Sequence, residues 1–176
     1  MSHIAEKRGF RLKNGGTVRL GGIDEESFFK ACALRVSDEQ KGFVAPPVGV
    51  IARGYLYRDC GARVFTVLLD GKVVGVALVR EFTDEPLGYD LQQFLIDKEY
   101  QNMGCGTAAL GLILGVLRDE GKYPCVEVCV KNADAAALHV YEKAGFADSG
   151  YTDPDCPDSL NLILRLQAEE EVEGKK

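Results

Sequence analysis

The sequence predicts an α/β protein of the α+β type, in which helices cover both faces of a mixed, mostly antiparallel central sheet. Two Val- and Leu-rich runs within "ARVFTVLLDGKVVGVALVR" (62–80) flank Asp70-Gly71, a dipeptide preferred in type I′ hairpin turns. Segments with helical spacing alternate with the remaining strand-like runs. A glycine-containing loop joins one such strand to a helix in "YQNMGCGTAALGLIL" (100–114).

The N-terminal half supplies one strand and two helices before the hairpin. "TVRLGG" (17–22) is predicted to be the first strand. "IDEESFFKACALRV" (23–36) is predicted to be a helix, which Asp24 can cap and whose first-turn glutamates suit the positive end of the helix. A polar loop (37–47) ends in two prolines, and a shorter helix is predicted at 48–59.

The C-terminal half alternates strands and helices. Strands are predicted at 88–97, 123–130 and 159–166. Helices are predicted at 107–121, ending at Gly121, and at 134–146, which Asp134 can cap and Gly145 can end. Because no repeat or linker divides the chain, one domain is expected over 1–166, followed by a charged tail (167–176) that is expected to be disordered.

Composition is that of an ordinary soluble globular protein. The chain has 176 residues, of which 46% are hydrophobic and 27% charged. There is no apolar run of transmembrane length and no secretory h-region, so a cytoplasmic location is expected. Six cysteines without a CxxC pair, and only two histidines, argue against a metal site or a disulfide framework.

Charge is unevenly distributed. Residues 1–20 carry a net charge of +4, so the rest of the chain carries −10 of the total of −6. An acidic body disfavours nucleic acid and favours a cationic partner, although acidic surfaces also serve solubility alone. We expect a small cationic amine as substrate and neither a nucleic-acid nor a membrane partner.

The glycine loop has the outline of a phosphate site, because glycines let backbone N–H groups approach an anion at a helix N-terminus. A Walker loop is excluded, since no lysine follows Gly106. Gly104, Gly106 and Ala109 match the Rossmann spacing, but an antiparallel hairpin precedes them instead of a series of βαβ units.

A third interpretation uses more of the chain. "QNMGCG" resembles the pyrophosphate loop of the GNAT superfamily of acetyl-CoA-dependent N-acetyltransferases, and "ALHVYEKAGF" is similar to that family's closing helix. "LRVSDEQKGFVAPP" resembles bacterial spermine/spermidine (diamine) N-acetyltransferases. The resemblance spans roughly residues 17–166 and implies acetyl-CoA as cofactor. A homodimer is compatible with this resemblance.

The resemblance implies a set of cofactor-binding residues. The backbone N–H groups of the loop would hold the pyrophosphate, Lys143 could meet a phosphate, and a strand segment would lie along the cofactor. These residues are Phe94, Leu95, Ile96, Gln101, Asn102, Met103, Gly104, Cys105, Gly106, Thr107 and Lys143. In such folds this strand splays from the next one, here 125–130, to admit the cofactor.

Acetyl transfer to an amine needs a base for the ammonium, N–H donors for the oxyanion and a proton or hydrogen bond for the departing thiolate. The resemblance implies that Tyr141 supplies the proton or hydrogen bond to the departing thiolate. Alternatively, Tyr141 only packs on Phe146 in a Schellman motif at the end of the helix. The resemblance also implies that a backbone N–H near Leu95 donates a hydrogen bond to the oxyanion. The common glutamate position falls on Gln92, so Asp90, acting through water, or Glu127 is left as the base; either could also be an ordinary solvated strand charge.

Acceptor recognition is expected from carboxylates that pair with the ammonium groups of a polyamine. Asp38 and Glu39 in the polar loop, and Asp84 and Glu85 before the central strand, are candidates. His139 is expected to be a surface or packing residue, since it lies two positions from Tyr141 on the helix. Other amine acceptors, or a CoA-binding module without catalysis, stay open.

Overall fold

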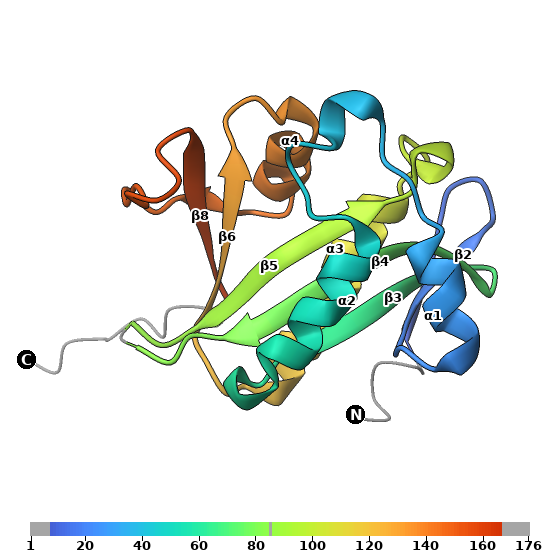
Figure 1. Ribbon diagram of the computed structural model, residues 1–176, viewed down its shortest axis with the longest axis horizontal. Helices are drawn as coiled ribbons and strands as arrows, with labels where there is room; N and C mark the ends of the chain where they lie inside the picture. The colour runs from blue at the N-terminus through green and yellow to red at the C-terminus, as the bar shows by residue number, and fades with distance from the viewer. Residues whose placement is uncertain (1–7, 85, 167–176) are drawn as a thin grey trace, which may run out of the picture.

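Eight strands form one sheet in the order β1-β2-β3-β4-β5-β6-β8-β7, which confirms the predicted fold class (Figure 1). The computed structural model describes residues 8–84 and 86–166. Among the described strands, β5 and β6 are the one parallel pair of neighbours. The strands are β1 (Gly9–Arg11), β2 (Thr17–Gly21), β3 (Arg63–Leu69), β4 (Lys72–Glu81), β5 (Tyr89–Ile96), β6 (Cys125–Lys131), β7 (Ala147–Asp148) and β8 (Ser159–Arg165).

The predicted hairpin is confirmed as β3 and β4. Asp70 and Gly71 have φ angles of +50° and +84°, as a type I′ turn requires at both central positions. The Asp70 carboxylate also accepts a hydrogen bond from the Thr17 N–H at 2.9 Å, which ties the turn to β2. The sequence pattern missed β1 and β7, which are only three and two residues long.

Within the described part of the chain, four helices and three 3₁₀ turns connect the strands. Asp24 and Ser27 form a capping box that starts the first helix two residues later than predicted, and Asp134 caps the last helix through the Ala137 N–H at 3.0 Å. The helices are α1 (Glu25–Cys32), α2 (Pro47–Leu56), α3 (Cys105–Glu120) and α4 (Ala135–Lys143), and the 3₁₀ turns are η2 (Asp38–Gln40), η3 (Arg58–Cys60) and η4 (Lys98–Tyr100).

The sheet separates two apolar cores. Helices α1 and α2 lie on one face and pack on a smaller core that includes Leu78 and Leu95. Helix α3 lies on the other face, where it shares a larger core with Tyr141 of α4 (Figure 1). Within residues 8–84 and 86–166, no helix has both the length and the apolar character needed to cross a bilayer.

Strands β5 and β6 pair over two residues each and then separate, as the family resemblance implied. They are in register at Tyr89↔Val126 and Asp90↔Glu127 alone. Beyond Asp90, strand β5 keeps its pairing with β4, while β6 pairs with β8. The sheet is therefore open between β5 and β6, and the functional cavity lies at this opening.

Candidate active site

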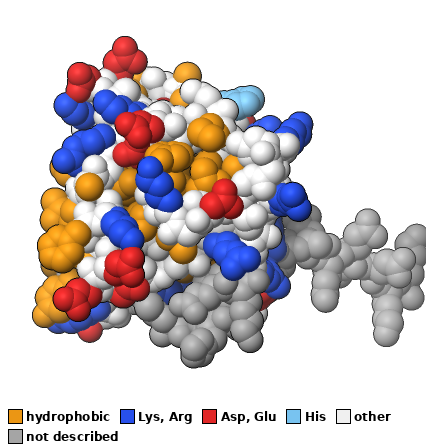
Figure 2. Space-filling model, turned by 90° about the vertical axis from the view of Figure 1, so that its right-hand side faces the viewer, with side chains coloured by type: hydrophobic (Ala, Val, Ile, Leu, Met, Phe, Trp, Pro, Cys, Tyr) orange, Lys and Arg blue, Asp and Glu red, His pale blue; other side chains and the backbone are white. Residues whose placement is uncertain are grey.

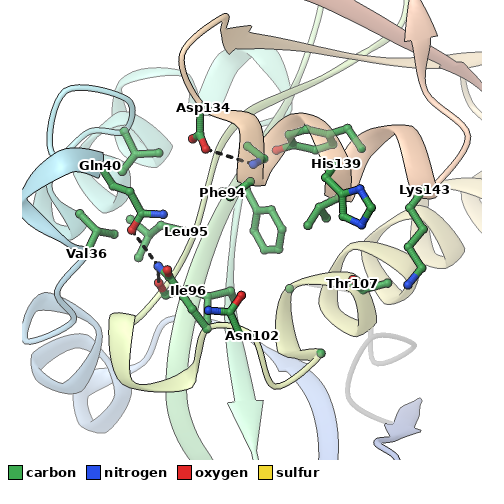
Figure 3. Close-up of a pocket in the computed structure, with 18 residues that line it drawn as sticks. Val36, Gln40, Phe94, Leu95, Ile96, Asn102, Thr107, Asp134, His139 and Lys143 are labelled. Atoms are coloured by element: carbon green, nitrogen blue, oxygen red, sulfur yellow. Dashed lines mark hydrogen bonds between the residues drawn. The ribbon is translucent and has the colours of Figure 1, made fainter.

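A cavity of about 330 Å³ lies where β5, the loop before α3, helix α4 and the segment between α1 and α2 meet (Figure 3). Apolar side chains make up most of its wall, and a few polar groups point into it. The lining residues are Val36, Gln40, Val44, Phe94, Leu95, Ile96, Gln101, Asn102, Gly104, Gly106, Thr107, Asp134, Ala136, Ala137, His139, Val140, Tyr141 and Lys143.

The loop before α3 presents a concentration of free donors to this cavity. Gly104 caps α3 with φ +87°, and the first helical hydrogen bond runs from the Ala108 N–H to the Gly104 carbonyl at 3.0 Å. Among the described residues, the N–H groups of Cys105, Gly106 and Thr107 therefore have no acceptor. Together with the positive end of a 16-residue helix, they suit an anionic group such as a phosphate.

The glycine at position 104 is required by its backbone conformation. A Cβ built there would meet only Leu12 Cδ2, at 3.5 Å, which is ordinary contact, but φ +87° lies in the region that L side chains rarely adopt. Two loop residues whose backbone N–H groups the resemblance implied for the cofactor, Met103 and Cys105, do not line the cavity. Met103 is 41% exposed, and Cys105 is buried in the α3 core, where burial raises the pKa of its thiol.

Gln101 fastens the loop to two other walls of the cavity. Its side-chain amide donates to the Ile96 carbonyl and to Gln40 Oε1, each at 2.9 Å (Figure 3). A second glutamine, Gln93, accepts the Ala45 N–H at 2.8 Å and holds the segment between α1 and α2 against β5. Neither Gln40 nor its segment was predicted to line the cofactor site, because these tertiary hydrogen bonds leave no pattern in the sequence.

Strand β5 contributes the floor of the cavity with residues 94–96. Its register against β4 shifts by one residue between Leu78 and Val79, so Gln92 is the extra residue of a β-bulge. Because β6 has already diverged here, the edge of β5 that faces the opening carries backbone N–H groups that no neighbouring strand uses. The Gln92 Oε1 atom is buried and has no hydrogen-bond partner among the described residues.

Tyr141 lines the cavity and also packs in the Schellman motif that ends α4. The Phe146 N–H donates to the Tyr141 carbonyl at 3.1 Å and the Gly145 N–H to the Glu142 carbonyl at 2.9 Å, the two bonds of a Schellman motif. The Tyr141 and Phe146 rings meet edge to face at 5.4 Å. Burial raises the pKa of the Tyr141 phenol above its usual range, and the Asp134 carboxylate raises it further.

Helix α4 adds two basic groups to the same wall. His139 and Lys143 are one turn apart and both line the cavity, and Lys143 extends toward Thr107 (Figure 3). His139 is exposed, as expected of a surface residue, and it also lines the cavity, which was not predicted. Its spacing of four from Lys143 was the signal in the sequence. Asp134 also lines the cavity while it caps α4.

Acidic side chains expected near the acceptor lie outside the cavity wall. Asp90 is 9% exposed, and its Oδ2 accepts from Arg80 Nε at 2.7 Å, on the face that α1 and α2 cover. Asp38 is exposed and paired with Lys41 Nζ at 2.5 Å, and Glu39 is exposed beside it. Asp84 is an exposed loop residue, and Glu85 lies outside the described residues.

The side of the molecule to the right in Figure 1, where η4 and the α3 loop reach the surface, has a mixed charge distribution. Figure 2 shows apolar side chains in the middle of this face, with lysine and arginine side chains around them and fewer acidic ones. These lysine and arginine side chains give the face a positive potential that suits the phosphates of a nucleotide-like cofactor, although the protein as a whole is acidic.

Comparison with known proteins agrees with this geometry. The chain matches the Acetyltransferase (GNAT) family over residues 30–146. None of the curated protein sequences matches it. Among solved structures, the GNAT domain of S. lividans PAT superposes with a TM-score of 0.75 at 19% identity, covering 94% of this chain and 99% of that chain.

Two further solved structures share the fold. Mycobacterium smegmatis RimJ in complex with CoA-disulfide has a TM-score of 0.69 at 18% identity, covering 96% of this chain and 89% of that chain. The ribosomal-protein-S18-alanine N-acetyltransferase from Escherichia coli has a TM-score of 0.63 at 19% identity, covering 89% of this chain and 99% of that chain.

Proposed function

The chain belongs to the GNAT family and is an acetyl-CoA-dependent N-acetyltransferase, and from this premise we propose that it acetylates a primary amine of a polyamine or diamine such as spermidine or spermine. The observation that carries the cofactor assignment is the loop before α3, with Gly104 at φ +87° and the unused N–H groups of the first helical turn. A pyrophosphate matches this donor set in charge and in hydrogen-bonding capacity.

The cofactor-binding residues fall into two groups. Backbone N–H groups of residues 101–107 bind the pyrophosphate, and Lys143, with His139 one turn before it, faces the phosphates from α4. The apolar wall formed by Phe94, Ile96 and Val140 would enclose the pantetheine arm. Acetyl-CoA supplies a thioester, an acyl group already activated toward attack by an amine.

The protein's own groups stabilise the charges that develop during transfer. A backbone N–H near Leu95, on the unpaired edge of β5, donates to the oxyanion. The Tyr141 hydroxyl donates to the departing thiolate. Because the pKa of Tyr141 is raised, the phenol stays protonated at neutral and moderately alkaline pH and remains a hydrogen-bond donor.

The polyamine assignment depends on charge at the edge of the cavity and on the sequence of the η2 segment. Gln40 lines the cavity, and Asp38 and Glu39 precede it on the same 3₁₀ turn with their side chains in solvent. Remote ammonium groups of a polyamine can pair there while one amine reacts at the thioester. The −10 charge of residues 21–176 attracts such an acceptor over a longer range.

A protein α-amine is the second candidate. The observation that favours it is the structural similarity to the ribosomal-protein-S18-alanine N-acetyltransferase from Escherichia coli. An N-terminal peptide carries one reacting amine and a backbone, so it does not depend on a second ammonium group for binding.

We expect spermidine and spermine to be acetylated with a higher kcat/KM than a monoamine of similar length. The preference should shrink as salt rises, because pairs with exposed carboxylates are screened over a Debye length of about 8–10 Å near physiological ionic strength. Release of free thiol from acetyl-CoA measures the rate with each amine and with N-terminal peptides. Equal use of neutral-tailed monoamines, or a salt-independent preference, would remove the polyamine assignment, and faster turnover of the peptides would replace it.

A further inference from the structure

Three charged side chains form a row across the sheet at the last rung that β5 and β6 share. Arg80 of β4 is in register with Asp90 of β5, and Asp90 is in register with Glu127 of β6. Their neighbours along each strand point into the α3 core, so these three side chains point to the opposite face. Those core-facing neighbours are Val79, Tyr89, Leu91, Val126 and Val128.

The charges along this row are not balanced. Asp90 Oδ2 forms an ion pair with Arg80 Nε at 2.7 Å, and the Arg80 guanidinium carbon also lies 4.5 Å from the centroid of the Tyr57 ring. Glu127 is half-buried and forms no hydrogen bond or ion pair with another described residue. The row therefore has one carboxylate neutralised by a cation and a second carboxylate beside it without one.

Glu127 lies at the closed end of the opening between β5 and β6. Beyond this rung, β5 continues through the Gln92 bulge to Phe94, where the cofactor cavity begins. In Figure 1, α2 crosses in front of β3 and β4, while β6 and β8 lie to the left of both α1 and α2. Glu127 is not part of the cavity wall, but it is half-buried and its neighbour on the same face of β6, Cys129, is exposed, so this face is accessible to an acceptor. The cofactor would be held on the other side of the opening, by the α3 loop and α4.

We propose that Glu127 is the general base of the reaction, and that its carboxylate takes a proton from the acceptor ammonium directly or through one water. The freed amine attacks the thioester carbonyl carbon, the N–C bond forms, and the C–S bond breaks. The thiolate receives the second proton of the nitrogen, with Tyr141 as hydrogen-bond donor, and Glu127 releases its proton to solvent. The inference rests on amine acetylation and not on which amine is used.

The groups around Glu127 favour this role. Burial raises the pKa of Glu127, and the negative charge of Asp90 raises it further, which makes the carboxylate a stronger base than one in water. Arg80 stands one strand further away and is paired with Asp90. On its own strand Glu127 is flanked by Cys125 and Cys129, and from β8 it faces Ile163, with Arg165 across from Cys125.

The test compares Glu127→Gln with wild type over pH 4–9, at saturating acetyl-CoA, using an amine that wild type acetylates. At pH 7 we expect kcat/KM for the amine to fall by about 10²–10⁴-fold. The wild-type rate should level off above the pKa of Glu127. The variant can use only amine already deprotonated in solution, so its rate should rise about tenfold per pH unit toward an amine pKa of about 10.4.

Two further variants separate a base from a structural residue. Glu25→Gln, which changes an exposed carboxylate on α1, should keep the wild-type rate and profile. Asp90→Asn should move the acidic limb of the profile to lower pH, because the charge that raises the pKa of Glu127 is removed. A wild-type pH profile in Glu127→Gln, or a change in KM for the amine alone, would overturn the proposal. Failure of wild type with every amine would instead overturn the proposed acceptor class.

Discussion

Replacing Tyr141 with phenylalanine is expected to lower kcat by about 10²–10⁴-fold, the usual range for loss of a general acid or its hydrogen bond. The variant removes only the hydroxyl of a residue that lines the cavity. The edge-to-face contact with Phe146 and both Schellman hydrogen bonds involve the ring and the backbone, so they remain. The thermal midpoint should therefore stay close to that of wild type while turnover collapses.

Tyr151→Phe is the matched control, because Tyr151 is 58% exposed and its ring is not part of the cavity wall. It should retain wild-type kcat. The pH dependence gives a second check on Tyr141. A free phenol ionises near pH 10, but burial raises the pKa of Tyr141, so wild-type turnover should show no decline up to about pH 10. An unchanged kcat in Tyr141→Phe would leave this residue with a packing role only.

Replacing Gly104 with valine is expected to abolish stabilisation of the protein by CoA. Valine at φ +87° is strained by about 1–3 kcal/mol, so the loop should leave the conformation that aligns its N–H groups. In wild type, CoA at 100 times its Kd should stabilise the fold by about 2.7 kcal/mol, which appears as a rise in thermal midpoint. Thermal unfolding of both proteins with and without CoA measures the difference.

Gly111→Val serves as its control within the same helix. A Cβ at Gly111 meets no atom within 4 Å and its backbone is helical, so CoA should still stabilise that variant. Stabilisation of Gly104→Val by CoA to the wild-type extent would show that the loop conformation is not needed for binding. Stabilisation of wild type by NADH but not by CoA would contradict the cofactor assignment itself.

Local chemistry in the sequence was enough to predict most of the framework. Asp70-Gly71 defines its hairpin turn, Asp134 its helix cap, and Gly145 the Schellman motif, because each depends on residues within a few positions of one another. The same applies to the glycine loop, whose glycine and helix start are adjacent in the chain. The cofactor-binding residues 94–96 and 101–107 were instead implied by the family resemblance, and of these Met103 and Cys105 do not line the cavity.

Tertiary structure decided what lies opposite that loop and which charges are free. Gln40 reaches the cavity through a hydrogen bond to Gln101, 61 positions away, and His139 joins it because α4 packs across the opening. Arg80 and Asp90, ten positions apart, form an ion pair through the β4–β5 register, and the β5–β6 register places Glu127 beside them without an ion-pair partner among the described residues. Contacts of this kind depend on strand order and register, and in a single sequence no local pattern encodes them.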